Sequence, residues 1–113
     1  MRYMLLICGD DEAHNAMEAD GSFVASCHAW ADEMQQRGVL VTIGGLQAPS
    51  DATTVRLRGD QVLLTDGPFA ETKELIGGFS LIECSDLDEA LEVTAKHPAA
   101  RYGTIEIRPL LST

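Results

Sequence analysis

Hydrophobic residues in this chain form short apolar runs that alternate with helical stripes, which predicts strands and helices in turn. The segment from Tyr3 to Cys8 is almost continuously apolar, as expected for a central strand that is covered on both faces. After a weakly helical stretch to about Ala19, a helix is predicted from apolar residues at intervals of four, three and four: Phe23, Cys27, Trp30 and Met34. We expect this helix to end at Gly38, because glycine readily adopts the left-handed conformation that follows a last helical turn.

A β-hairpin is predicted in the middle of the chain. Val39 to Ile43 reads as a strand, and the segment from Gly44 to Ala52 reads as a connecting loop. Apolar and polar residues then alternate from Thr53 to Arg58, and the chain returns from Val62 to Thr65. The intervening Gly59-Asp60 predicts a two-residue turn of the primed class. We expect the polar face of this hairpin to meet water.

The last third of the chain predicts a strand, a helix and a second strand. Phe79 to Cys84 is the first strand, and Ser85 or Asp86 caps the helix that follows. The inner stripe of that helix is predicted to consist of Leu87, Ala90, Leu91 and Thr94, and Pro98 closes the helix. Thr104 to Arg108 alternates strictly, and the proline after it favours an edge position.

The order of these elements predicts one α+β domain over residues 1–113. Two strand-helix-strand units in tandem, with an inserted hairpin, correspond to a ferredoxin-like topology. Two helices can cover only one face of such a sheet, whereas the strand Met4 to Ile7 carries apolar side chains on both faces. Since monomers avoid large exposed apolar patches, we expect a homodimer whose two sheets pack into a barrel-like core.

The amino-acid composition indicates which binding partners and which cellular compartment to expect. The chain has 113 residues with eight basic and eighteen acidic side chains, a formal charge of −10 that disfavours nucleic acid and anionic membrane surfaces. The three cysteines, Cys8, Cys27 and Cys84, lie far apart in apolar runs, which indicates reduced thiols in a reducing compartment. The apolar start is too short for a signal sequence or a membrane span. We therefore expect a soluble cytoplasmic protein.

The segment Asp66 to Glu74, DGPFAETKE, is the most distinctive part of the chain. Its first three residues form a turn on structural grounds alone, because glycine tolerates unusual backbone angles and proline fixes its own. Phe69 is expected to anchor the loop in the core. The carboxylates around Lys73 are harder to explain as scaffold, although solvated ion pairs are the simple alternative. Loops held between strands often carry function.

The chain resembles the YCII-related proteins, and in particular their DGPF group. The resemblance covers nearly the whole chain and rests on the opening Tyr3 to Ile7, GGLQAP (44–49), TTVR (53–56), DGPFAETKE (66–74), GGF (77–79), DLDEA (86–90) and PAARYG (98–103) with Ile107-Arg108-Pro109. It implies a dimeric α+β barrel of bacterial origin with a pocket but no agreed activity. It also implies a possible accessory role beside a sigma factor. Some relatives have been proposed to use a histidine and aspartate pair, which matches no motif here.

The resemblance and the loop together define the expected site. Its ligand-binding residues are predicted to be Asp66, Gly67, Pro68, Phe69, Glu71, Thr72, Lys73, Glu74 and Arg108. If chemistry occurs there, Asp66 or Glu71 is the first candidate for a general base, and Lys73 would hold an anionic group. Arg108 is a candidate to bind a carboxylate in the pocket, with an ordinary ion pair as the alternative.

The histidines give a weaker signal. His28 and Asp32 are four residues apart, but helical geometry places both away from the apolar stripe, toward solvent. His97 is expected at a helix end, where the helix dipole would favour its charge. Trp30 and Met34 are expected to fill the core, with the lining of a ligand cavity as the alternative. The histidines and cysteines lack the close spacing of zinc ligands, so we expect no metal and no cofactor.

Two functions fit these observations. The first is a small-molecule binder or enzyme whose site is built from the DGPF loop, the inner sheet residues and, as an option, the partner subunit. The second is a non-enzymatic regulatory module that binds another protein, such as a sigma factor, through its acidic surface. A third reading, a purely structural oligomer, would show neither cavity nor acidic patch. A partly apolar cavity beside Glu71 and Lys73 would favour the first function.

Overall fold

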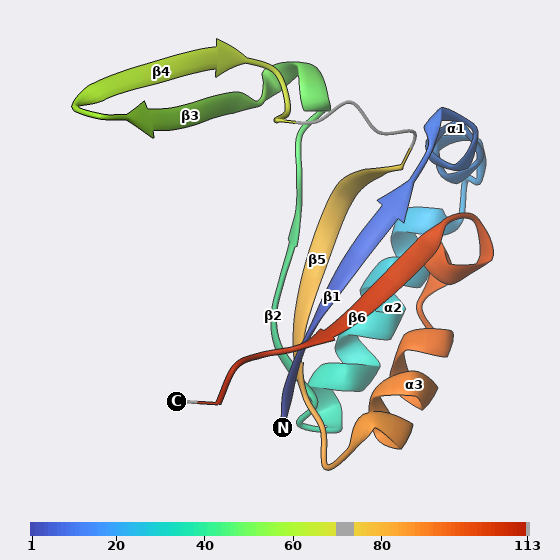
Figure 1. Ribbon diagram of the computed structural model, residues 1–113. Helices are drawn as coiled ribbons and strands as arrows, with labels where there is room; N and C mark the ends of the chain where they lie inside the picture. Colours follow the sequence, from blue (N-terminus) through green and yellow to red (C-terminus); the bar gives the residue numbers. More distant parts are fainter. Residues whose placement is uncertain (70–73, 113) are drawn as a thin grey trace.

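The protein is described by a computed structural model that covers residues 1–69 and 74–112 (Figure 1). In chain order its elements are β1 (Arg2–Gly9), α1 (Asp11–Ala19), α2 (Phe23–Gln36), β2 (Leu40–Gly45), the short 3₁₀ helix η1 (Pro49–Asp51), β3 (Thr53–Arg58), β4 (Gln61–Asp66), β5 (Leu75–Glu83), α3 (Leu87–Ala95), the 3₁₀ helix η2 (Pro98–Arg101) and β6 (Thr104–Pro109).

Four of the strands form one antiparallel sheet in the order β2-β5-β1-β6. This order is consistent with the predicted ferredoxin-like α+β topology. The central position of β1 and the edge position of β6 are both confirmed. β5 is longer than expected, because Gly77 and Gly78 lie inside the strand, next to an irregularity in its pairing with β1, rather than before it.

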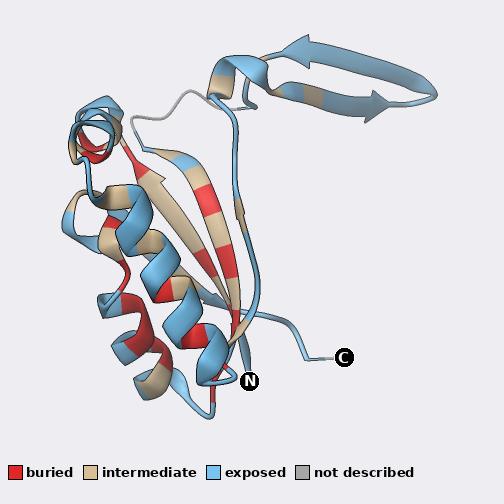
Figure 2. Ribbon diagram, turned by 180° about the vertical axis from the view of Figure 1, so that it is seen from behind, coloured by how far each residue is buried: buried red, intermediate tan, exposed pale blue. Residues whose placement is uncertain are grey.

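The core lies between this sheet and the layer of α2 and α3, which cover the same face (Figure 2). Its buried cluster contains Tyr3, Leu5, Trp30, Met34, Val39, Ile82, Cys84, Ala90 and Val93. Trp30 and Met34 therefore fill the core, as predicted. The indole N–H of Trp30 donates a hydrogen bond of 3.0 Å to the carbonyl of Val93 and so ties α2 to α3.

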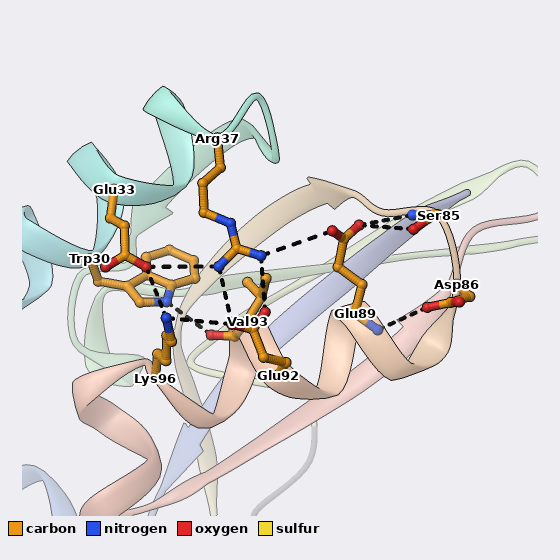
Figure 3. Close-up of polar contacts among 9 residues, drawn as sticks. All are labelled: Trp30, Glu33, Arg37, Ser85, Asp86, Glu89, Glu92, Val93 and Lys96. Atoms are coloured by element: carbon orange, nitrogen blue, oxygen red, sulfur yellow. Dashed lines mark hydrogen bonds and ion pairs between the residues drawn. The ribbon is translucent and has the colours of Figure 1, made fainter.

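Ion pairs join the outer sides of the same two helices (Figure 3). Arg37, just after α2, binds both carboxylate oxygens of Glu92 on α3, at 3.2 and 2.9 Å. Lys96 lies 3.4 Å from Glu33 on α2 and 3.4 Å from Glu92. These exposed pairs raise the pKa of Arg37 and lower that of Glu92, because each charge stabilises the other. Because these pairs are exposed to solvent, each contributes little to the stability of the fold.

The cap of α3 is as predicted, but its inner stripe is partly wrong. Asp86 is the N-cap and accepts a hydrogen bond of 2.9 Å from the backbone N–H of Glu89. The buried residues of the helix are Ala90, Val93 and Thr94, whereas Leu87 and Leu91 are each 51 % exposed. The helix therefore turns Val93, rather than Leu87 and Leu91, toward the core, where it belongs to the same buried cluster as Trp30.

The predicted hairpin forms as a separate two-stranded sheet of β3 and β4. Gly59 in its turn has a φ of 61° and Gly38 after α2 has a φ of 72°, the left-handed angles expected at both positions. Figures 1 and 2 show that the hairpin projects from the end of β2, on the side of the main sheet opposite the helices. Both of its faces are largely exposed, so exposure is not limited to the polar face.

None of the described helices lies on the second face of the main sheet (Figures 1 and 2). Tyr3 and Leu5 point into the core, so Met4 and Leu6 on the same strand point to this open face. The β1–β5 register places Leu81 opposite Met4 and Phe79 opposite Leu6, and all four side chains are only half-buried. The expectation of apolar side chains on both faces is therefore correct for β1.

Candidate functional site

A cavity of about 590 Å³ lies where the hairpin joins the edge of the main sheet. We call it the loop cavity. Its walls come from the segment after β2, from η1, from the turn after β4 and from the start of β5. The lining residues are Leu46, Gln47, Ala48, Pro49, Asp51, Ala52, Pro68, Glu74, Leu75 and Ile76. The surface is mostly apolar, and the two carboxylates and one amide are its polar groups.

The DGPF turn is positioned by backbone hydrogen bonds at the base of the hairpin. Gly67 has a φ of 93°, and its N–H donates to the carbonyl of Ala52 at 2.7 Å. The hydroxyl of Thr54 donates to the carbonyl of Gly67 at 2.8 Å. A glycine is required here because other residues rarely adopt this backbone angle. The turn thereby holds Pro68 against the loop cavity.

The prediction that Phe69 anchors the loop in the core is wrong for the single chain. Its side chain is 73 % exposed. The turn leaves the hairpin beyond the edge of the main sheet, so the ring cannot reach the space between sheet and helices. The guanidinium of Arg56 on β3 lies 4.8 Å from the centre of the ring instead. This cation–π contact holds Phe69 against the hairpin.

Glu74 connects the loop cavity to the far edge of the sheet. It precedes β5, and its carboxylate accepts a hydrogen bond of 3.3 Å from the hydroxyl of Thr104 at the start of β6. Cys8 lies on β1 directly opposite Thr104. Burial, then the charges of Glu106 and Glu74, raise the pKa of the Cys8 thiol. Cys8 is therefore protonated at neutral pH and is a poor nucleophile.

The other predicted site residues are only partly brought together. Asp66 ends β4 opposite Thr53, is exposed, and is not among the residues that line the loop cavity. Arg108 lies on β6 opposite Met4, forms an ion pair with Glu106 and also does not line the cavity. The ion pair is the alternative that the sequence left open. Glu71, Thr72 and Lys73 lie outside the residues that the structure describes.

Comparison with known proteins decides the family. The model of the YCII-related domain matches residues 1–113. The chain belongs to the YCII-related domain family. It is also 34 % identical over 114 residues to an uncharacterized protein of Rhizobium meliloti (strain 1021), an alignment that covers 97 % of this chain and 92 % of that protein.

In this YCII-related domain none of the three histidines lines the loop cavity. His28 and Asp32 are exposed on α2, as predicted from the helical spacing. His97 is only 4 % exposed, and its ring lies 4.6 Å from that of Trp30. Burial lowers its pKa to about 4, so the imidazole is neutral. The predicted role of a charged His97 at the helix dipole is therefore wrong, because burial opposes the charge more strongly.

Neither activated thiols nor metal ligands were found among residues 1–69 and 74–112. The three cysteines are free, and burial raises the pKa of each, that of Cys84 to about 11. In the same residues, groups of three or more histidine, cysteine or acidic side chains that could hold a metal ion are absent. No described helix is long and apolar enough to cross a membrane.

Most of the cavity wall was missed by reasoning from the sequence. The segment from Leu46 to Ala52 was interpreted as a simple connector, yet it supplies six of the lining residues. Leu46 donates its backbone N–H to the carbonyl of Gly77 at 2.9 Å, which holds the start of this segment against β5. The available signal was the presence of apolar Leu46 and Pro49 in a loop that also carries Gly44-Gly45 and Gln47.

Proposed function

We propose that this protein is a small-molecule-binding homodimer of the DGPF group whose ligand occupies the loop cavity. The cavity carries the proposal. Its volume of about 590 Å³ lies within the usual range for ligand sites, roughly 300–1,000 Å³, and its mostly apolar wall with a few polar groups is also typical of them. Two members of the DGPFAETKE motif, Pro68 and Glu74, line it.

The lining residues define the class of ligand. Leu46, Pro49 and Ile76 favour a compact apolar body. Asp51 and Glu74 accept hydrogen bonds when ionised, so the polar end of the ligand would donate them, as an amine, amide or hydroxyl does. Binding is the primary activity in this proposal. Catalysis by Asp66, Glu71 or Lys73 remains a prediction from the sequence, and the high pKa of Cys8 argues against a thiolate mechanism.

The open face of the sheet supports the homodimer. Met4, Leu6, Phe79 and Leu81 form one apolar surface without a covering helix. Gly44 on β2 leaves room for the ring of Phe79 on this surface, because a Cβ at position 44 would lie only 2.7 Å from that ring. A second copy that packs the same face against this one would bury both surfaces and give the barrel-like core expected from the sequence.

A ligand screen with a cavity-filling variant tests the proposed site. Thermal unfolding is measured with a metabolite library for the wild type, for Ala48→Trp and for Ala25→Trp. Ala48 lines the cavity, whereas Ala25 is exposed on α2 and serves as the control. A true ligand raises the melting temperature of the wild type and of Ala25→Trp, because it binds only the folded state. It has little effect on Ala48→Trp, whose indole occupies the cavity.

Two outcomes contradict the proposal. A ligand that stabilises all three proteins equally binds elsewhere and removes the loop cavity as the site. If no compound in a chemically broad library raises the melting temperature of the wild type, the proposal of small-molecule binding is refuted. The alternative is then the regulatory module that binds a protein such as a sigma factor, for which the formal charge of −10 suits a basic partner.

A further inference from the structure

The hairpin of β3 and β4 has one continuous apolar face that the described residues of its own subunit leave exposed. In the hairpin register Val55 lies opposite Leu64, and Leu57 lies opposite Val62. These four side chains are between 59 % and 68 % exposed. We call them the arm face. Because side chains alternate along a strand, Arg56 and its neighbours lie on the other side of the hairpin.

An isolated hairpin is not stable by itself in water. Two strands alone are marginal, and they need a third strand or a packed face for independent stability. β3 and β4 pair only with each other among the described strands. The hydrogen bonds at Gly67 hold the base of the hairpin, not the arm face. The arm face therefore needs a packing partner.

The direction of the hairpin indicates where that partner lies. Figures 1 and 2 both show it projecting on the open side of the main sheet, away from α2 and α3. The hairpin and the open face of Met4, Leu6, Phe79 and Leu81 thus lie on the same side of the main sheet. A second copy that covers the open face, as in the homodimer proposed above, is within reach of the hairpin.

The charge of the hairpin is compatible with docking on a second copy. Residues 53–66 contain two arginines and two aspartates, so the hairpin is neutral. The rest of the chain has six of the eight basic residues and sixteen of the eighteen acidic residues. It therefore carries the whole formal net charge of −10. The hairpin itself carries no net charge, so like-charge repulsion does not oppose its docking on an acidic second copy.

We propose that the hairpin is a dimer arm, whose apolar face docks on the second copy of the same chain. The inference rests on the homodimer of the proposed function and adds the element that extends its interface. Two-fold symmetry makes the exchange reciprocal, so each copy gives one arm and receives one. Ala52 and Pro68 lie at the base of the arm and line the loop cavity, so docking of the arm also fixes two walls of that cavity.

Adjacent residues on the two faces of β4 provide a matched test. Val62→Glu places a charge on the arm face, and Gln61→Glu places the same charge on the other face one residue away. Both positions are exposed in the single chain, so both variants are expected to fold. Sedimentation velocity over a wide range of protein concentration measures the dimer. We expect the wild type and Gln61→Glu to be dimers with similar dissociation constants. The dissociation constant of Val62→Glu should be higher by about tenfold or more.

A second pair keeps the test valid if a glutamate disturbs folding, which circular dichroism reveals. Leu64→Gln changes the arm face, and Leu63→Gln changes the opposite face with identical chemistry. Equal dimer dissociation constants for the wild type and both arm-face variants would refute the arm and leave the sheet-to-sheet dimer in place. A monomeric wild type would refute both the arm and the homodimer, while the ligand screen would still test the loop cavity.

Discussion

Protonation of His97 is expected to destabilise the fold as the pH falls below neutrality. The imidazole is 4 % exposed and packs against Trp30 in the core. Its Nδ1 accepts a hydrogen bond of 3.0 Å from the backbone N–H of Ala99, so that nitrogen carries no proton in the folded state. Burial lowers the pKa from the ordinary 6.5 to about 4. Unfolding exposes the ring and restores the ordinary pKa.

The sign and size of the effect follow from proton linkage. Between pH 4 and pH 6.5 the unfolded chain binds more protons at His97 than the folded chain does. The free energy of unfolding therefore falls as the pH falls through this window, and the full effect is about 3 kcal/mol. Measurements are kept at pH 5.0 and above, because the net charge of the protein approaches zero near its isoelectric point of about 4.5. Between pH 7.5 and pH 5.0 the expected loss from this residue is about 2 kcal/mol.

The measurement is urea unfolding followed by the fluorescence of Trp30, for the wild type and for His97→Asn. The Oδ1 of asparagine can accept the same hydrogen bond from Ala99 as Nδ1 does, but asparagine does not titrate. The variant loses the ring contact and is less stable at pH 7.5. Its disadvantage should shrink by about 2 kcal/mol at pH 5.0, because the acidic residues common to both proteins cancel in the comparison. If the free energy of unfolding changes by the same amount between pH 7.5 and pH 5.0 in both proteins, the reasoning is refuted.

Two further substitutions test the packing and the capping that the structure shows. Gly103→Ala should lose about 2 kcal/mol or more, because its Cβ would collide with the carbonyl oxygen of Cys8; Gly21→Ala, where the space is open, is the control. Equal melting temperatures for the two alanine variants would contradict this close approach. Asp86→Ala should lose about 1 kcal/mol in urea unfolding, because the first turn of α3 loses its cap. The same loss in Asp88→Ala, which is not the cap, would show that a general charge effect is responsible.

Part of the candidate site could be predicted from the sequence. The DGPF turn was predicted from Gly67 and Pro68, whose backbone preferences are local, and its place between two strands followed from the flanking patterns. The opposite wall, Leu46 to Ala52, carries no motif of known chemistry and was missed. Phe69 was placed in the core on general burial habits, which take no account of a hairpin that leads the chain away from the core.

The sequence by itself determined the elements, their order and the apolar character of both faces of β1. Periodicity, caps and the glycines at positions 38 and 59 act over a few residues, so they can be read before the fold is known. Only the tertiary structure decided the rotation of α3, the neutrality of His97 and the existence of the loop cavity. Each of these depends on segments that are distant in sequence and meet in space, and burial, not local pattern, sets their energies.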